Sequence, residues 1–354
     1  MAMTRESVDL TALTTRIERW FQSNARDLPW RRRRTRWRAY VSEIMLQQTQ
    51  VSRVVERFEG FMARFPKPRD LAEAPEDDVN ALWAGLGYYR RARLLQAAAR
   101  VMVEKHGGRV PGNMDDLLAL PGVGRYTAGA IASIACDQPA PIVDGNVHRV
   151  LARIWCDPVA ADDREGSERT WQRSQLLVES SSQPAVFNEG LMELGAMVCT
   201  PRSPDCRQCP VNRSCAARRQ DLVDVIPPPK QRPVQQVEHH HAVGIIRRGR
   251  LVVHQRSDRG RWAGLWQVPT VEAARRLRPA DICRRVDLPI EQLTHVGAFE
   301  RVLTHRRVQF HVYRGELARG ARLPAAFTWI GRDVDLPVGV AQRKTLEMLH
   351  WLDG

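Results

Sequence analysis

Four cysteines stand close together near the middle of the chain. Their spacing is C-x6-C-x2-C-x5-C, and they are four of the seven cysteines in the sequence: Cys199, Cys206, Cys209 and Cys215. Four thiolates in so short a segment can hold either a zinc ion or an iron–sulfur cluster. Zinc ribbons usually pair two C-x2-C knuckles across a longer loop, and only one such knuckle is present here. The other cysteines are isolated, and we expect them to be small buried hydrophobic residues: Cys136, Cys156 and Cys283.

Two acidic residues lie where a carboxyl group could take part in catalysis. Glu43 stands in an otherwise apolar stretch, so we expect it to be partly buried, with a raised pKa that lets it donate a proton near neutral pH. Asp144 precedes a predicted helix, whose N-terminal partial charge should lower the pKa of Asp144 and keep it ionised. The alternatives are that Glu43 is an exposed charge on an amphipathic helix, and that Asp144 is only a helix cap. Asn146 can cap the same helix.

A turn with two glycines, Leu120-Pro121-Gly122-Val123-Gly124, joins two predicted helices. One helix is expected to end near Leu120 and the next to begin near Arg125. The glycines allow a tight turn with exposed backbone N–H groups, and the following helix N-terminus adds partial positive charge. We therefore expect a phosphate cradle, although such a turn can also simply connect two helices. The residues expected to contact a DNA backbone are Gly122, Val123 and Gly124.

The excess of basic residues indicates a polyanionic partner. The net charge is +14 and the isoelectric point is near 10.2, yet the chain has only four lysines, and the other basic residues are arginines. A GC-rich genome would explain arginine in place of lysine, but not the excess of basic over acidic residues. The charge therefore supports nucleic-acid binding. Arginines are dense in residues 31–38; such a run is usually a solvated face, and Arg31 is its best candidate for a phosphate contact.

The elements that must position these residues divide the chain into three predicted parts. Residues 1–220 form an all-α domain, because apolar residues recur at intervals of three and four between short turns with Pro or Gly. Residues 221–237 are a linker, since three consecutive prolines cannot lie in a packed helix. Residues 238–354 form a smaller α+β domain. Its strands are expected at 242–246, 250–254, 308–313 and 327–330, and its helices at 271–277 and 342–352.

Length and composition indicate a folded protein of two domains. The chain has 354 residues, of which 43% are hydrophobic and 27% charged. No apolar run approaches the roughly 18 residues of a membrane span, so we expect no membrane partner. The first residues lack the hydrophobic region of a signal peptide, so we expect a cytoplasmic protein associated with the nucleoid. In that reducing compartment the cysteines should not form disulfides.

The combination of three motifs resembles the endonuclease III superfamily of helix-hairpin-helix DNA glycosylases. These motifs are the hairpin, Asp144 about 20 residues after it, and the four-cysteine loop. The resemblance implies a [4Fe–4S] cluster on the four cysteines and a catalytic Asp144. Members that also cut the DNA backbone carry a lysine, two positions after the second glycine of the hairpin, that forms a Schiff base with the sugar. Tyr126 stands there instead, so we expect a monofunctional enzyme that leaves an abasic site.

Further segments resemble the MutY family of adenine DNA glycosylases, and the resemblance extends over nearly all of residues 20–219. The segments are 28–31, 42–51, 83–89, 187–189 and 193–196. The resemblance implies that the enzyme flips an adenine out of the duplex and hydrolyses its bond to deoxyribose. The adenine would be mispaired with 8-oxoguanine or with guanine. The expected partner is double-stranded DNA with such a mispair, bound by a monomer.

Carried over residue by residue, the resemblance assigns roles in the chemistry. Glu43 is the general acid, Asp144 stabilises or captures the sugar cation, and Tyr126 and Asn146 line the same pocket. The residues expected to contact the flipped adenine are Trp30, Arg31 and Glu189.

Other residues are implied to contact the surrounding duplex. Gln48 and Tyr88 would wedge into the base stack, while Thr49 and the Leu86 backbone would face the oxidised guanine. Without the resemblance, Gln48 would be interpreted as part of a helix surface and Tyr88 as a core aromatic residue.

Residues from about 238 onward resemble, more loosely, the Nudix-like domain with which MutY proteins recognise 8-oxoguanine. The best local match is 260–269. The stretch after it, 272–276, lacks the R-E-x-x-E-E cluster that binds metal in Nudix hydrolases, so we expect no pyrophosphohydrolase activity. In the family, a Phe-Ser-His loop probes the oxidised base. The nearest match is Leu303-Thr304-His305, which makes Thr304 and His305 candidates, although Leu303 departs from the pattern.

Two other functions remain open on the sequence. One is a pyrimidine-specific endonuclease III, which Tyr126 and the additional C-terminal domain disfavour. The other is a damage sensor without catalytic activity. The presence of both Glu43 and Asp144 disfavours a sensor, because a protein that only binds DNA needs no acidic residues facing a polyanion.

Overall fold

The computed structural model describes residues 9–160, 163–229, 235–257, 260–303, 306–334 and 336–352. The chain folds into two compact units: Met1–Glu73 with Leu94–Gln231, and Ala74–Arg93 with Arg232–Gly354. The division places residues 74–93 in the second unit, whereas the predicted helical domain of residues 1–220 included them. The predicted boundaries at 220 and 238 stay predictions. Two candidate site residues lie outside the described part of the chain: Thr304 and His305.

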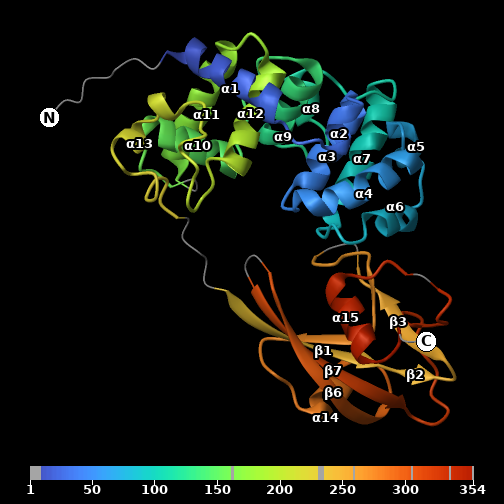
Figure 1. The fold of residues 1–354 in the computed structure, drawn as a ribbon. Helices are drawn as coiled ribbons and strands as arrows, with labels where there is room; N and C mark the ends of the chain where they lie inside the picture. Colours follow the sequence, from blue (N-terminus) through green and yellow to red (C-terminus); the bar gives the residue numbers. More distant parts are fainter. Residues whose placement is uncertain are drawn as a thin grey trace. The chain divides into compact units, whose positions relative to one another are not determined.

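Helices make up the regular structure of residues 9–160 and 163–229, as predicted, and no strand occurs in these ranges (Figure 1). In chain order the elements are α1 (Leu10–Asn24), α2 (Pro29–Arg32), α3 (Arg36–Leu46), α4 (Val51–Arg64), α5 (Pro68–Ala72), α6 (Glu76–Trp83), α7 (Arg90–Lys105), α8 (Met114–Leu118), α9 (Arg125–Ala130), the π-helix η1 (Ile131–Ala135), α10 (Gly145–Trp155), α11 (Arg164–Glu179), α12 (Pro184–Met197), the short 3-10 helix η2 (Asn212–Ser214) and α13 (Ala216–Arg219).

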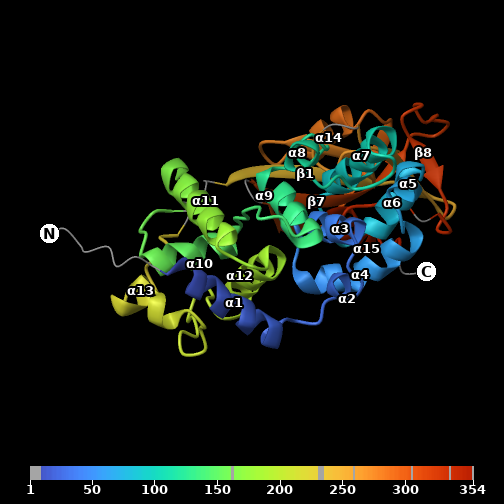
Figure 2. The same ribbon diagram turned by 90° about the horizontal axis from the view of Figure 1, so that it is seen from above.

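Helices α1, α10 and α12 lie side by side in the first unit (Figures 1 and 2). Leu13 and Ile17 of α1 are one helical turn apart, so both face the same core. Two glycines let the helices approach closely. A Cβ atom at Gly190 would lie 2.9 Å from Ile17, and one at Gly195 would lie 2.7 Å from the Asn146 Cβ. Gly195 thereby brings α12 against the first turn of α10, where Asp144 and Asn146 are found.

Besides α6 and the start of α7, the second unit consists mainly of strands, together with two further helices. The elements are β1 (Gln236–Gly244), β2 (Ile246–Arg247), β3 (Arg250–Gln255), β4 (Trp266–Gln267), β5 (Thr270–Ala273), α14 (Pro279–Arg285), β6 (Ile290–Val302), β7 (Arg306–Leu317), β8 (Thr328–Ile330) and α15 (Val340–Met348). One sheet has the order β5-β1-β7-β6, with β1 and β7 parallel and the other pairs antiparallel. The other sheet has the order β2-β3-β4, and β8 pairs with β3.

The two helices cover opposite faces of the β5-β1-β7-β6 sheet. Successive residues of a strand point to opposite faces, so Ala242 and Val243 of β1 belong to different cores. Val243 shares a core with Ile282 of α14. Ala242 shares the other core with Leu346 of α15. The α+β class predicted for this region is therefore confirmed.

The predicted elements of the second unit are partly right. Each of the four predicted strands overlaps an observed one, and the helix expected at 342–352 corresponds to α15. The helix expected at 271–277 is wrong, because Thr270–Ala273 forms β5 in register with His239–Ala242 of β1. Strand β6 was not predicted; most of its side chains are at least partly exposed and many are polar. Strand β1 begins at Gln236, inside the predicted linker.

None of the helices in the described ranges is both long enough and apolar enough to cross a membrane.

Candidate active site

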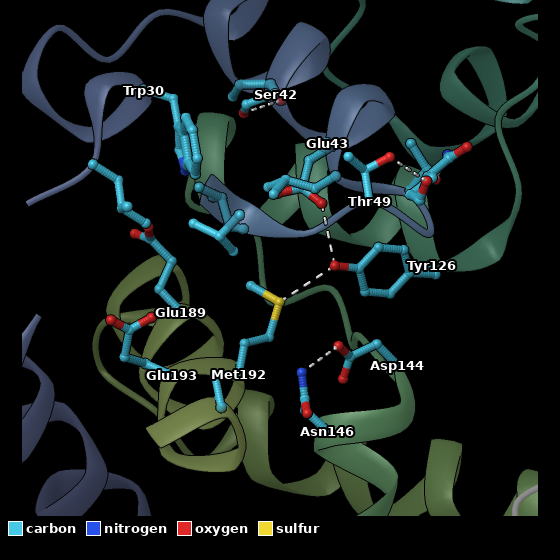
Figure 3. A pocket seen from close by; sticks show the side chains of 18 of the residues that line it. Trp30, Ser42, Glu43, Thr49, Tyr126, Asp144, Asn146, Glu189, Met192 and Glu193 are labelled. Carbon is cyan, nitrogen blue, oxygen red and sulfur yellow. Dashed lines mark hydrogen bonds between the residues drawn. The ribbon is translucent and has the colours of Figure 1, made fainter. Parts of the chain in front are cut away.

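A cavity of about 700 Å³ opens among α2, α3, α9, α12 and the start of α10, all within the first unit (Figure 3). It brings together residues that are up to 170 positions apart in the sequence. The predicted site residues that line it are Trp30, Arg31, Glu43, Gln48, Thr49, Gly122, Gly124, Tyr126, Asp144, Asn146 and Glu189.

Glu43 lies on the buried side of α3, whose N-terminus is capped by the Thr35 side chain. Its residue surface is only 8% exposed. Burial raises the pKa of Glu43 to about 7, and the charges of Glu189 and Asp144 also raise it, while a hydrogen bond from Tyr126 lowers it. The predicted burial and raised pKa are confirmed, and the alternative of an exposed charge is wrong.

Tyr126 follows the hairpin and points its hydroxyl group at Glu43. Its Oη donates a hydrogen bond to Glu43 Oε2 at 3.1 Å and lies 3.3 Å from Met192 Sδ. Burial, together with the charges of Glu43 and Asp144, raises the pKa of Tyr126 well above its ordinary value. The phenol therefore stays protonated. In Figure 3 its ring lies between Glu43 on one side and Asp144 with Asn146 on the other.

Asp144 is the N-cap residue of α10. Its carboxylate accepts a hydrogen bond from the Val147 backbone N–H at 2.7 Å and one from Asn146 Nδ2 at 3.2 Å. The predicted lowering of the Asp144 pKa is wrong: burial raises the pKa, and the hydrogen bonds and Arg149 offset this only in part. Asn146 is not the cap that we considered, because it lies within the helix and donates to Asp144.

Arg149, one turn along α10, connects this carboxylate to the cysteine loop. Its Nη2 donates to Asn146 Oδ1 at 2.8 Å and to the Gly195 carbonyl at 2.8 Å. Its Nε donates to the Cys199 carbonyl at 2.8 Å. A continuous chain of hydrogen bonds therefore runs from the loop through Asn146 to Asp144.

Another wall of the cavity, which we call the ion-pair wall, consists of three arginines that pair with two glutamates of α12. Arg26 Nε lies 2.8 Å from Glu193 Oε1, and Arg31 Nη2 lies 3.1 Å from Glu193 Oε2. Arg31 and Arg34 also pair with Glu189, at 3.1 and 2.5 Å. Burial alone would raise the pKa of Glu193, but the hydrogen bonds and charges of Arg26 and Arg31 lower it to about 2.

The arginine run at 31–38 is largely paired within the protein. Arg31 is engaged with both glutamates of the wall, and Arg32 pairs with Asp27 at 2.5 Å. Arg38 pairs with Glu59. These pairs disfavour the phosphate contact that we expected of Arg31 and place its guanidinium at the cavity instead.

The hairpin has the predicted geometry, with α8 ending at Leu118 and α9 beginning at Arg125. Gly122 has a φ of +78°, and a Cβ atom there would lie 2.9 Å from the Leu94 Cβ, so the position needs glycine. The Val123 N–H donates to the Leu120 carbonyl at 3.2 Å. This bond disfavours the expected phosphate contact of the Val123 amide. The contacts of Gly122 and Gly124 with DNA stay predictions.

The residues expected to wedge into the duplex or to face the oxidised guanine lie in tight turns. Gln48 and Thr49 stand between α3 and α4, and Gln48 has a φ of +55°, so the alternative of a regular helix surface is wrong. Leu86 and Tyr88 lie between α6 and α7, in the second unit. Leu86 is 4% exposed, whereas Tyr88 is 53% exposed, so Tyr88 is not a core aromatic residue.

The lining residues that were not predicted from the sequence include Arg26, Met192 and Glu193. A signal was present for two of them, because positions three and four after Glu189 on α12 share its helix face. The role of Arg26 had no local signal, since its partner Glu193 is 167 positions away.

The four clustered cysteines line a second, smaller cavity of the first unit, as the spacing predicted. Arg153, 2% exposed, places Nη1 3.3 Å from Cys199 Sγ and donates to the Thr200 carbonyl. In the described ranges, no three His, Cys, Asp or Glu side chains are grouped so that they could hold one metal ion. The isolated cysteines are only partly buried, so the prediction of buried residues is right only in part: Cys136, Cys156 and Cys283.

Comparisons with known proteins agree with this geometry. Residues 41–174 match the family described as HhH-GPD superfamily base excision DNA repair protein, and residues 241–348 match the NUDIX domain. Among solved structures, the chain is similar to a thermostable thymine-DNA glycosylase, with a TM-score of 0.54 and 28% identity over 60% of this chain and 97% of that chain. A non-covalent endonuclease III–DNA complex, at 22% identity and a TM-score of 0.51, shares the fold over 63% of this chain and 99% of that chain.

Similarity to curated proteins extends over both units. The adenine DNA glycosylase of Homo sapiens is 36% identical over 371 aligned positions, which cover 87% of this chain and 68% of that protein. The adenine DNA glycosylase of Rattus norvegicus is also 36% identical, over 91% of this chain and 73% of that protein. Identity at this level, over most of both sequences, shows that the chain belongs to the adenine DNA glycosylase family of base-excision repair proteins.

Proposed function

We propose that this protein hydrolyses the N-glycosidic bond of adenine mispaired with 8-oxoguanine or guanine in double-stranded DNA. The observation that carries the proposal is that one cavity holds two carboxyl groups in different environments. Glu43 is buried beside a phenol and has a pKa of about 7. Asp144 caps a helix and accepts hydrogen bonds from Val147 and Asn146. Membership of the adenine DNA glycosylase family gives this pair its substrate.

Glu43 is suited to protonate the departing base. Adenine leaves poorly as an anion, so a proton must be delivered to it, most usefully at N7. A general acid works best when its pKa lies near the working pH, because it is then protonated often and still gives up its proton readily. With a pKa of about 7, Glu43 meets both conditions.

Asp144 is suited to stabilise the sugar. Departure of the base leaves an oxocarbenium-like deoxyribose, which a nearby carboxylate stabilises or captures until water adds to the anomeric carbon. This division of work between two carboxyl groups is the logic of glycoside hydrolysis. The base must first leave the stack and enter the cavity, which is the step of base flipping.

The ion-pair wall is suited to recognise the adenine. Glu189 offers a carboxylate to the exocyclic amine, Arg31 offers N–H donors to a ring nitrogen, and both line the cavity. Trp30 adds an apolar surface and is itself held edge-on by Phe58, with 5.5 Å between the ring centroids.

The base opposite the adenine would be read by residues outside this pocket. Gln48 and Tyr88 enter the base stack in this proposal, and Thr49 and the Leu86 backbone face the oxidised guanine. Thr304 and His305 of the Nudix-like domain remain the candidates for probing it.

The four clustered cysteines are suited to hold a [4Fe–4S] cluster. Four sulfurs around a single zinc ion at about 2.3 Å would lie only about 4 Å from one another. The four cysteines line one small cavity, and their unequal spacing with a single C-x2-C knuckle favours a cluster over a zinc ribbon. The buried Arg153 beside Cys199 supplies positive charge for the thiolates. The cluster would order the loop against α10. Iron and sulfide analysis should find about four of each per chain.

Release of bases from defined duplexes tests the proposed function. The purified protein, incubated with duplexes that contain an A:8-oxoguanine, A:G or A:T pair, should release adenine from the first two. The strand should stay intact until it is heated in alkali, because Tyr126 occupies the position of the Schiff-base lysine. Release of a pyrimidine, or of no base, would contradict the proposal. A stoichiometric protein–DNA adduct after borohydride reduction would contradict the monofunctional assignment.

A further inference from the structure

The loop between α6 and α7 is held in an unusual backbone conformation. Three of its residues have positive φ angles: Gly85 at 93°, Gly87 at 69° and Tyr88 at 48°. Glycine adopts this region readily, but a tyrosine does so only when its surroundings impose it. Tyr88 is also 53% exposed, while Leu86, two positions before it, is buried. The loop therefore presents one aromatic ring to solvent from a constrained backbone.

Arg91 is the residue whose contacts constrain this loop. It is only 8% exposed, and its Nη2 donates to the carbonyls of Leu86 and Gly87 at 3.0 and 3.1 Å. The Trp83 indole N–H donates to the same Gly87 carbonyl at 3.0 Å. The Arg91 backbone N–H donates to the Tyr88 carbonyl at 2.8 Å. Arg91 therefore ties the backbone on both sides of Tyr88.

The guanidinium of Arg91 also contacts the aromatic rings at each end of the loop. Its Cζ lies 5.3 Å from the centroid of the Trp83 ring and 5.6 Å from that of Tyr88. Both distances lie within the usual range for a cation–π interaction. Lysine could not reproduce this arrangement, because a single ammonium group lacks the planar fork that stacks on a ring while bonding two carbonyls.

We infer that Arg91 is a positioning residue that holds Tyr88 ready to enter the base stack beside the mispair. The inference rests on the proposed function, in which Tyr88 wedges into the duplex. A ring held in place before binding loses less conformational freedom when it inserts, so a prepared wedge distorts DNA more readily than a mobile one. Arg91 touches no reacting atom in this role; it acts through Tyr88.

A double-mutant cycle with Tyr88 tests the inference. The full-length variants are Arg91→Met, Tyr88→Ala and the double variant, with Arg90→Met as the control. Arg90 is the adjacent, exposed arginine, so its substitution removes the same charge without touching the loop carbonyls. The readouts are single-turnover adenine release and the fluorescence of a 2-aminopurine placed beside the mispair, which rises when its neighbours unstack.

Arg91→Met should lower both the release rate and the fluorescence rise by about tenfold, the scale of one lost base–aromatic stack. Arg90→Met should change them by less than about twofold. In the Tyr88→Ala background, Arg91→Met should have no further effect, because the ring through which Arg91 acts is already gone. Arg91→Lys, which keeps the charge, should fall between Arg91→Met and the unmodified protein.

The outcomes separate the inference from the function on which it rests. If the unmodified protein released no adenine, or if Tyr88→Ala matched it, the proposed function or its wedge would be wrong. If Tyr88→Ala were slow but Arg91→Met behaved like Arg90→Met, the positioning role would be overturned. Additive effects in the double variant would overturn it as well. So would an Arg91→Met variant that fails to fold while Arg91→Lys behaves like the unmodified protein, because Arg91 would then be only a core cation.

Discussion

Glu43 and Glu193 are buried glutamates on two walls of the same cavity, and their pKa values are shifted in opposite directions. Glu43, on the α3 wall, is 8% exposed and has a pKa of about 7. Glu193, on the α12 wall, is 2% exposed and has a pKa of about 2. Burial therefore does not decide the charge of a carboxyl group in this protein.

The difference lies in the partners. Glu193 receives charged hydrogen bonds from Arg26 and Arg31, which favour its ionised form more than burial disfavours it. Glu43 receives only a neutral hydrogen bond from Tyr126, and its charged neighbours include the carboxyl groups of Glu189 and Asp144. One wall thus provides a fixed negative charge and the other an acid, within a single cavity. Substitutions on one wall should therefore affect mainly the rate of adenine release, and substitutions on the other mainly the stability of the fold.

The largest effect is expected from Glu43→Gln, which keeps the volume of the side chain but removes its proton. Single-turnover release of adenine should fall by about 10²- to 10⁴-fold, the range for loss of a general acid. Binding of mispaired DNA, measured by gel shift, should change little, because Glu43 carries no fixed charge pair. A near-normal rate in this variant would show that another group protonates the adenine.

A similar but smaller loss is expected from Asp144→Asn. The amide keeps part of the helix cap but cannot stabilise a sugar cation, so single-turnover release should fall by about 10²- to 10³-fold. Far-UV circular dichroism serves as the control, since loss of the cap should cost only about 1 kcal/mol of stability. An unfolded variant would show that Asp144 is chiefly structural. A folded variant that cleaves normally would exclude Asp144 from the chemistry.

A feature of the site could be predicted from the sequence where the residues that interact lie close together in the chain. The burial of Glu43 follows from its apolar neighbours in the sequence, and the Gly122 turn follows from its two glycines. The Asp144 pKa was predicted in the wrong direction, because the helix terminus is visible in the sequence but the burial around it is not. The ion-pair wall joins α12 to residues more than 150 positions away in the sequence, so no local sequence pattern predicts it.

The fold was predictable to a similar degree. Helices of the first unit repeat their apolar residues regularly, and glycine and proline mark their ends. Strand β6 escaped prediction because its outward positions are polar and no turn signal isolates it. The stretch 271–277 was expected to be a helix, but pairing with β1 decides the structure of its first residues. Local propensity yields to such tertiary pairing.

On the ion-pair wall, Glu193→Gln should lower the free energy of unfolding more than it lowers the rate of adenine release. The pKa of Glu193 is lowered from its ordinary value of 4.5 to about 2, which corresponds to about 3 kcal/mol of stability at neutral pH. Because the folded pKa is lowered, this contribution is fully present above about pH 4.5 and is lost as the pH falls towards 2. Denaturant unfolding of the first unit, followed by hydrogen exchange, should therefore show a difference at pH 7 that shrinks below pH 4.5.

Glu168→Gln is the matched control for this substitution. Glu168 pairs with Arg125 at 3.2 Å, but both side chains are about half exposed. An exposed pair contributes less than about 1 kcal/mol, so the control should change stability little at any pH. Equal losses of stability in the two variants would contradict the idea that the Glu193 carboxylate stabilises the fold because it is buried and paired with arginines.

The smallest effect, and the most specific one, is expected from Tyr126→Phe. Release of adenine should slow as the pH rises through about 7, because Glu43 loses the proton that it must donate. The Tyr126 hydrogen bond favours ionised Glu43, so its removal should raise the pKa of Glu43 and move the midpoint of this decline upward by about one pH unit. Single-turnover rates between pH 5.5 and 9.5 measure the midpoint separately from any loss of rate.

Met192→Leu is the control for this substitution. It removes the other acceptor near the Tyr126 hydroxyl and leaves the bond to Glu43, so the midpoint should not rise. A midpoint that stays in place in Tyr126→Phe would mean that the Tyr126 hydrogen bond does not help to set the pKa of Glu43, which burial and the neighbouring charges would then determine.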